Sequence, residues 1–421
     1  MAQIRRKTHA AEAREYLLRA REMGIPLSWN NYEAMLPQDG FARLGLTCTN
    51  CLLGPCRLDP FARTEGKTVC GLGKKELVLR RLAALLGAPP EAAADLSALL
   101  SAARSAADAR AAEAKEPAYI GGSRQVGLGV LQRGTVNLVA EGVAPADLSA
   151  LVAAARQLQP EAERAGARGF HIVLAGDVSP CADLPVVSPA GTVEFALLTG
   201  LADAYLLGAD AVGIGRNAAA GLHTAVLSAA GSFDPRAVLL AGADAYAARS
   251  GHGRLELEVQ ELTFTDDAHA MGLAEQYDCV AIFGGGSNLK QVVDDLVVKS
   301  ARAMSKAGAL CAAYGNAAVI LAKYGVENVL CCGSNAMLPE AARLFVGKRA
   351  VVLMPELLTG ADLAAALSLG SRGIPVLTAT ELPTAGCAEV ADALAGMVAY
   401  AEAPEYPEAA MAALRVPAAV K

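Results

Sequence analysis

Short apolar runs alternate with longer amphipathic stretches along the chain after about residue 118. Three runs of strand length are VNLVA (136–140), HIVLAG (171–176) and AYLLGA (204–209), and a helical pattern, PADLSALVAAARQLQPEAERAG (145–166), separates the first two. Continuous apolar runs of this length are typical of strands that are buried on both faces of a parallel sheet. Their alternation with helices predicts an α/β fold with a Rossmann-like parallel sheet.

The same alternation starts again further along the chain. CVAIFG (279–284) and AVVLMP (350–355) have strand character, and LKQVVDDLVVKSARAMSKAG (289–308) has helical character. The polar stretch ELTFTDDAHA (261–270) lies before this second set, and an alanine-rich helical pattern upstream ends at Lys115. We therefore predict a helical segment over 1–118, a Rossmann-like α/β domain over 119–262 and a second one over 263–421.

Four cysteines of the N-terminal segment form the strongest chemical signal in the sequence. They are Cys48, Cys51, Cys56 and Cys70, separated by two, four and thirteen residues in a loop bounded by glycines. Thiolates are soft anionic donors that bind iron well, and four at these spacings can hold one [4Fe-4S] cluster. Structural zinc is an alternative, although only the first pair has the CxxC form that zinc sites usually repeat. Unmetallated structural thiols are the third interpretation.

Composition and charge narrow the class of protein. The chain has 421 residues, of which 53% are hydrophobic, so it can bury several sizeable cores. The net charge of -6 and the pI near 5.6 argue against a nucleic-acid partner. The charged N-terminal helix is not a signal peptide, and no run reaches the roughly 18 apolar residues of a membrane span. We expect a cytoplasmic protein whose ten cysteines are metal ligands or buried thiols rather than disulfides.

The stretch LPQDGFARLGLTCTNCLLGPCRLDP (36–60) resembles the N-terminal cluster segment of the anaerobic nickel-iron carbon monoxide dehydrogenases, of the hybrid-cluster (prismane) superfamily. The resemblance continues in family order through later segments: GTVNLVAEGVAP (134–145), GFHIVLAGDVSP (169–180), EFALLTGLADAYLLGADAVGIG (194–215), YDCVAIFGGGSNLK (277–290), AAYGNAAVILAKYG (312–325), NVLCCGSN (328–335) and MPELLTGADLAAALSLGSRGIPVL (354–377). It implies an iron–sulfur redox protein with a [4Fe-4S] cluster on the four cysteines.

The resemblance also implies a nickel-iron-sulfur cluster held by one histidine and five cysteines, and this chain has none of the six. The matching positions fall on Glu141 or Val143, near Gly176, near Val212, and on Gly286, Asn316 and Asn335. Glycine and valine offer no side-chain donor, and an asparagine amide is a poor ligand for a soft metal centre. The family's catalytic lysine falls at or near Ala361, and its dimer-bridging cysteines fall on Asp39 and Thr47. The chain therefore resembles a shortened, divergent member of this family that lacks the ligands of the nickel-iron-sulfur cluster and of the dimer-bridging cluster.

The remaining six cysteines allow two interpretations. Cys279 and Cys311 lie in strand-like runs and resemble small buried hydrophobes. Cys181, Cys331, Cys332 and Cys387 follow or close predicted strands, where the functional groups of parallel sheets gather. These four either fill the core or hold a displaced cofactor in the former active-site cavity.

Two classes of function follow. In the first, the protein is a [4Fe-4S] protein without carbon monoxide oxidation, which transfers electrons or senses redox state within a complex. Its partner would be a ferredoxin-like protein or a flavoprotein, and the resemblance implies a homodimer or a subunit of a larger complex. In the alternative, it is an oxidoreductase whose cavity holds a different metal centre or a small-molecule substrate, using Glu141, Asn316, Asn335 and nearby cysteines. The sequence assigns no catalytic residue.

Overall fold

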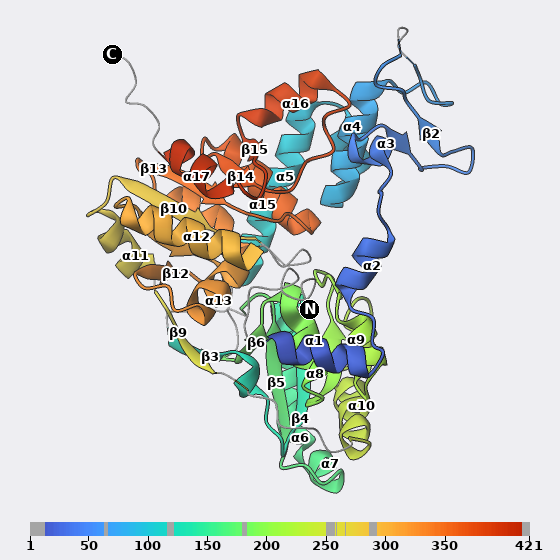
Figure 1. The fold of residues 1–421 in the computed structure, drawn as a ribbon, viewed down its shortest axis with the longest axis vertical. Helices are drawn as coiled ribbons and strands as arrows, with labels where there is room; N and C mark the ends of the chain where they lie inside the picture. The colour runs from blue at the N-terminus through green and yellow to red at the C-terminus, as the bar shows by residue number, and fades with distance from the viewer. Residues whose placement is uncertain are drawn as a thin grey trace.

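The computed structural model describes residues 13–62, 66–115, 122–178, 183–249, 257, 259–265, 267–285 and 293–414. Figure 1 shows two α/β units, one in green at the bottom and one in yellow to red at the top, with N-terminal helices in blue against both. In the described ranges, no helix combines the length and the apolar character needed to span a lipid bilayer.

The first unit is built on a seven-stranded sheet in the order β8-β7-β4-β5-β6-β3-β9. The strands are β3 (Gly122–Val126), β4 (Val136–Glu141), β5 (Phe170–Ala175), β6 (Val186–Ser188), β7 (Ala202–Leu207), β8 (Ala225–Ser228) and β9 (Gln260–Phe264). Its helices are α6 (Pro145–Gln157), α7 (Gln159–Arg164), α8 (Val193–Leu198), α9 (Arg216–Ala220) and α10 (Pro235–Ala247), with short 3-10 turns η3 (Leu128–Val130) and η4 (Ala190–Thr192). All neighbours are parallel except β3 and β9, which pair antiparallel.

The edge strand β9 includes the start of the polar stretch 261–270, which the sequence suggested was a connection between the two α/β domains. Leu262 and Phe264 are buried while Glu261 and Thr263 are exposed. This alternation with a period of two residues is that of a strand with one solvated face.

The second unit has a six-stranded, wholly parallel sheet in the order β12-β11-β10-β13-β14-β15. The strands are β10 (Cys279–Phe283), β11 (Leu310–Ala313), β12 (Val329–Cys331), β13 (Arg349–Leu353), β14 (Val376–Thr378) and β15 (Val398–Tyr400). The helices are α11 (Asp267–Ala274), α12 (Val293–Lys306), α13 (Gly315–Lys323), α14 (Ala341–Leu344), α15 (Gly360–Ser371), α16 (Ala388–Ala395) and α17 (Tyr406–Leu414), with the 3-10 segment η5 (Asn335–Glu340). In sequence order the strands run 3-2-1-4-5-6, which is the order of a Rossmann sheet. The predicted α/β fold is confirmed.

The N-terminal segment contacts both units. It contains α1 (Ala13–Glu22), α2 (Ser28–Ala34), α3 (Gly40–Arg43), the hairpin β1 (Thr47–Cys48) and β2 (Cys56–Arg57), α4 (Lys74–Leu86), η2 (Pro90–Ala93) and α5 (Leu96–Lys115). Tyr16 of α1 packs on Phe195 of α8, with ring centroids 5.8 Å apart. Leu82 of α4 and Leu99 of α5 are fully buried in the core of the second unit, together with Leu363 of α15.

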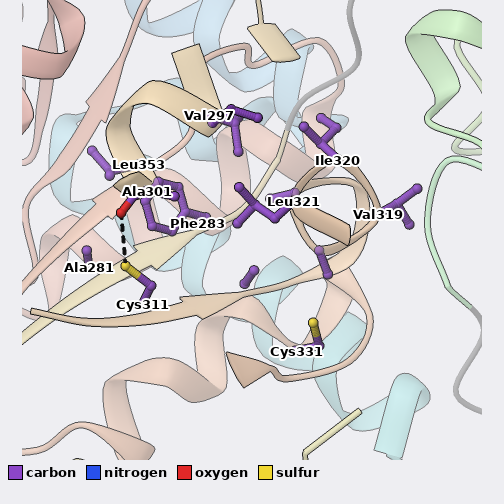
Figure 2. Packing of buried hydrophobic residues seen from close by; sticks show 14 of the residues in the cluster. Ala281, Phe283, Val297, Ala301, Cys311, Val319, Ile320, Leu321, Cys331 and Leu353 are labelled. Atoms are coloured by element: carbon purple, nitrogen blue, oxygen red, sulfur yellow. Dashed lines mark hydrogen bonds between the residues drawn. The ribbon is translucent and has the colours of Figure 1, made fainter. Parts of the chain in front are cut away.

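The core of the second unit surrounds the central strand β10. Phe283 lies opposite Leu353 of β13 in the parallel register and is fully buried. Figure 2 shows its ring beside Val297 and Ala301 of α12. The Cys311 thiol lies here too, with its Sγ 3.6 Å from the Ala301 carbonyl oxygen, and burial raises its pKa to about 12. Cys311 is thus the buried apolar residue that the sequence predicts.

Truncating Phe283 tests this packing. We expect Phe283→Ala to lower the free energy of unfolding by about 3–5 kcal/mol, because the sheet cannot close around the lost ring. Chemical denaturation followed by circular dichroism measures the change. Tyr400→Ala, at an edge strand of the same sheet where the ring is 51% exposed, is the control and should stay within about 0.5 kcal/mol of the wild type. Equal effects of the two substitutions would contradict the assigned core.

Candidate functional site

The four predicted cluster cysteines lie on and next to the hairpin β1–β2. Cys48 and Cys56 are direct partners in its antiparallel register, so their side chains share one face of the ribbon. The hairpin is anchored beneath by Leu46 and Leu58, which are buried with Leu77 of α4. This anchor fixes the two thiols against the helix that follows.

A tight turn closes the hairpin around Cys51. The Gly54 amide donates to the Cys51 carbonyl oxygen at 3.2 Å. A Cβ atom at position 54 would lie 3.1 Å from the Cys48 carbonyl oxygen and 3.3 Å from the Cys51 carbonyl oxygen. Those distances are tighter than ordinary contacts, so glycine lets the turn fold close to the cysteine backbone.

Cys70 is held by a second small turn. The Thr68 side chain is buried, and its hydroxyl oxygen lies 3.3 Å from the Cys70 Sγ while accepting from the Leu72 amide at 2.9 Å. The hydrogen bond with Thr68 lowers the pKa of the Cys70 thiol, and the positive charge of Arg80 acts in the same direction. A lowered pKa favours the thiolate, which is the form that binds metals.

All four cysteines are free, with Cys51 and Cys70 exposed and Cys48 and Cys56 half-buried. Across the described part of the chain, no three His, Cys, Asp or Glu side chains group closely enough to hold a single metal ion. A [4Fe-4S] cluster requires a wider arrangement than a single ion does, because its four thiolates surround the whole cluster instead of converging on one ion. Three soft donors on the hairpin and its turn, together with the Cys70 thiol that Thr68 stabilises, are the donors that such a cluster would use.

A second candidate site is a cavity of about 480 Å³ where the carboxyl ends of the two sheets face each other. The family resemblance matches certain positions to a metal ligand or to the catalytic lysine, and every one of them that the structure describes lines this cavity. These positions are Glu141, Val143, Gly176, Val212, Asn316, Asn335 and Ala361. Gly286 lies outside the described residues. Residues that are far apart in the sequence thus meet at the edge where parallel sheets place their functional groups.

Glu141, at the carboxyl end of β4, is buried in the wall of this cavity. Its carboxylate accepts from the backbone amides of Val212 at 2.8 Å and Gly213 at 3.1 Å, and from the Tyr205 hydroxyl. Desolvation raises the pKa of Glu141, and this effect is larger than the opposite effect of the hydrogen bonds. The carboxylate therefore joins the ends of β4 and β7 and their loops.

A chain of hydrogen bonds crosses from the first sheet to the second. Asp177, after β5, accepts from the Ser334 hydroxyl at 2.8 Å and from the Asn335 amide at 2.9 Å. The Asn335 side chain accepts from the Gly285 amide at 2.6 Å and donates to Asp362 at 3.2 Å. Burial raises the pKa of Asp177 to about 6 and raises that of Asp362 as well. Asn335 is thus a structural link between the units.

Sequence reasoning missed Asp177, Asp362 and Ser334 as parts of this site. Asp362 had a visible signal, because Thr359 and Asp362 form a capping box at the start of α15. Asp177 follows an apolar strand directly, which is where a parallel sheet presents its side chains. Neither position matches a metal ligand in the family resemblance.

The polar lining of the cavity does not fit a nickel-iron-sulfur cluster. Its ionisable side chains are Glu113, Glu141, Asp147, Asp177, Asp210 and Asp362 with one cation, Arg110. The Arg110 guanidinium donates to both Asp210 oxygens, at 2.6 and 2.9 Å. The described lining residues include no thiol and no imidazole, and carboxylates and amides are hard donors that suit a sulfide-bridged centre poorly.

The idea that other cysteines hold a displaced cofactor is wrong for the three that the structure describes. Cys331 and Cys332 are buried at the end of β12, and burial raises the pKa of Cys331 to about 12. Cys387 packs against the core of the second unit. None of the three is among the residues that line the cavity. Cys181 lies outside the described residues.

Comparison with known proteins bears on both sites. "Carbon monoxide dehydrogenase 1" of Carboxydothermus hydrogenoformans is 42% identical over 83 residues, and that of Methanosarcina acetivorans is 40% identical over 79 residues. These stretches cover 20% and 19% of this chain and 13% of either relative, so the chain matches only about an eighth of their length. No family model matches the chain.

The fold likeness extends much further than the sequence likeness. The structure of carbon monoxide dehydrogenase IV from Carboxydothermus hydrogenoformans aligns with a TM-score of 0.75 at 16% identity, over 97% of this chain and 99% of that one. At this identity the match shows the fold alone. Together with the local sequence matches, it confirms the resemblance to the carbon monoxide dehydrogenases.

The raised pKa of Asp177 predicts a pH dependence of stability. Folding raises this pKa from 3.8 to about 6, so protonation stabilises the folded state below about pH 4 and the benefit is lost as the pH rises through 6. In Asp177→Asn the side-chain oxygen can still accept from the Val178 and Asn335 amides, and the new amide can donate to the Ser334 hydroxyl. We expect the wild type to lose stability relative to this variant between pH 4 and 6. Urea denaturation across this range measures the difference, and parallel curves would contradict it.

Proposed function

We propose that the protein is a [4Fe-4S] electron-transfer or redox-sensing protein, with its cluster on Cys48, Cys51, Cys56 and Cys70. One contrast carries the proposal: four free cysteines lie on and next to the hairpin β1–β2, whereas the described lining of the large cavity offers only hard donors. The likeness to carbon monoxide dehydrogenases supports iron–sulfur chemistry, and the lining of the cavity supports the loss of carbon monoxide oxidation. We place the protein in the cytoplasm of an anaerobic cell, as a homodimer or as part of a larger complex.

The residues of the hairpin have separate tasks in this mechanism. The pairing of Cys48 with Cys56 presents two thiols on one face, and the Gly54 turn holds the backbone of Cys51 at the end of the hairpin. Thr68 favours the thiolate of Cys70. When bound, the cluster supplies one-electron transfer, with a ferredoxin-like protein or a flavoprotein as its redox partner.

Metal analysis tests the proposal directly. Anaerobically purified protein should contain about four irons and matching acid-labile sulfide per chain, without stoichiometric nickel or zinc. The reduced form should give the electron paramagnetic resonance spectrum of a single cluster. One zinc ion per chain without iron would contradict the proposal, and stoichiometric nickel would contradict the loss of the catalytic cluster.

A second candidate function rests on the cavity itself. Its 480 Å³ falls within the roughly 300–1,000 Å³ typical of small-molecule sites. An anion would meet six carboxyl groups and one guanidinium that Asp210 already pairs, so the cavity favours a neutral or positively charged polar molecule. In this alternative the protein is an oxidoreductase whose refitted cavity binds a small substrate.

Replacing one cluster cysteine tests its assignment as a ligand. We expect Cys56→Ser to lower iron and sulfide to less than about half of the wild-type content and to abolish electron transfer, because a hydroxyl is a much poorer iron ligand than a thiolate. Iron and sulfide assays with cyclic voltammetry measure both effects. Cys387→Ser, a half-buried cysteine outside the hairpin, is the matched control and should retain the cluster. Full iron content in Cys56→Ser would contradict the assignment of Cys56 as a cluster ligand.

Filling the cavity tests the second candidate function. We expect wild-type protein to carry a small co-purifying molecule that native mass spectrometry detects, and Ala361→Phe to lose it because the larger ring occupies the lining at the start of α15. Iron content should be the same in both proteins, which controls for folding. A wild type that shows only the mass expected from its own sequence and cluster would contradict a ligand in this cavity.

A further inference from the structure

The turn that carries Cys70 is closed by three hydrogen bonds around one threonine. The Thr68 amide donates to the Leu72 carbonyl oxygen at 2.9 Å, and the Leu72 amide donates back to the Thr68 hydroxyl oxygen at 2.9 Å. Between them, the Gly71 amide donates to the Thr68 carbonyl oxygen at 2.9 Å. Gly71 has a φ of 89°, which residues other than glycine rarely adopt. The backbone around Cys70 is thus fixed by contacts within five residues.

This turn has the same support as the cysteine hairpin. Leu72 and Cys48 both pack against the apolar base of the hairpin. That base consists of Leu46, Leu58 and Leu77. The turn and the hairpin are therefore tied to one small core, although Cys48 and Cys70 are far apart in the sequence.

The partners of the Thr68 hydroxyl determine the direction of its proton. A threonine hydroxyl has one proton to donate, and its oxygen accepts with lone pairs. The Leu72 amide uses the oxygen as an acceptor, so the proton is left for another partner. The Cys70 Sγ lies 3.3 Å from this oxygen. A metal-bound cysteine is a thiolate and has no proton, so the Thr68 hydroxyl is the donor when Cys70 binds a metal.

Burial strengthens this hydrogen bond. Thr68 is only 5% exposed, so little water competes for its hydroxyl, while Cys70 itself is exposed. Within the described ranges, this is the one side-chain hydrogen bond to a sulfur of the four hairpin cysteines. The donor therefore acts on a single, identifiable ligand.

We propose that Thr68 is a positioning residue that donates a hydrogen bond to the Cys70 thiolate and thereby raises the reduction potential of the cluster. This inference rests on the proposed function, because the hydrogen bond has a redox effect only if Cys70 is a cluster ligand. Reduction by the redox partner adds one electron and increases the negative charge on the sulfur ligands, with no bond formed or broken. A donor at one of these sulfurs stabilises the added charge and so favours the reduced state.

The experiment is a redox titration of the anaerobically purified protein, followed by electron paramagnetic resonance of the reduced cluster. We expect Thr68→Val, which removes the hydroxyl at nearly constant volume, to lower the equilibrium constant for reduction about tenfold, or about 59 mV for one electron. Thr68→Ser restores the hydroxyl and should restore the wild-type potential. Thr47→Val is the matched control, because the Thr47 hydroxyl is buried on the same hairpin and has no hydrogen-bond partner in the described part of the chain. It should leave the potential unchanged.

Electron–nuclear double resonance in deuterium oxide is an independent arm of the experiment. The reduced wild type and Thr68→Ser should both show the coupling of an exchangeable deuteron to the cluster, and Thr68→Val should lose it. The absence of any such coupling in the wild type would overturn the inference without reference to a variant.

The remaining outcomes separate the inference from the proposed function. An unchanged potential in Thr68→Val at full iron content would overturn the inference, while the spectrum of a single cluster would leave the proposed function standing. Loss of the cluster in Thr68→Val would overturn it too, by showing that Thr68 is needed to retain the iron and does not tune it. Wild-type protein without iron would instead overturn the proposed function, and the inference with it.

Discussion

The hydrogen-bond chain from Asp177 through Ser334 and Asn335 to Asp362 joins the two sheets where their strand ends meet. Facing carboxyl ends leave many backbone amides directed at a common space, and each buried amide needs an acceptor. Side-chain carboxylates and amides supply those acceptors from within the chain. A scaffold of this kind holds the two units in register around the cavity.

The two candidate sites differ in the softness of their donors. The hairpin collects thiols on a surface loop, while the cavity collects carboxylates that desolvation pushes towards their protonated forms. Soft and hard donors select different ligands, so the two sites serve different chemistry even though they belong to one fold.

Much of this arrangement was predictable from the sequence, for identifiable reasons. Strands β4, β5 and β7 are continuous apolar runs because both faces of their sheet are covered, and the cysteine spacing is short enough to fix a local hairpin. Strand β9 was not recognised, because its exposed face gives it a polar composition. The roles of Asp177 and Cys331 could not be predicted, because whether a side chain at a strand end faces the cavity or the core depends on contacts with a distant segment.

The packing of α4 and α5 has a consequence for how the chain folds during synthesis. These helices are made early, yet the apolar residues that cover Leu82 and Leu99 belong to β10–β15 and α15, which leave the ribosome near the end. Contacts of such large sequence separation form slowly, and exposed apolar helices are open to aggregation in the interval. The apolar faces of these early helices therefore gain their final cover only when the last sheet is complete.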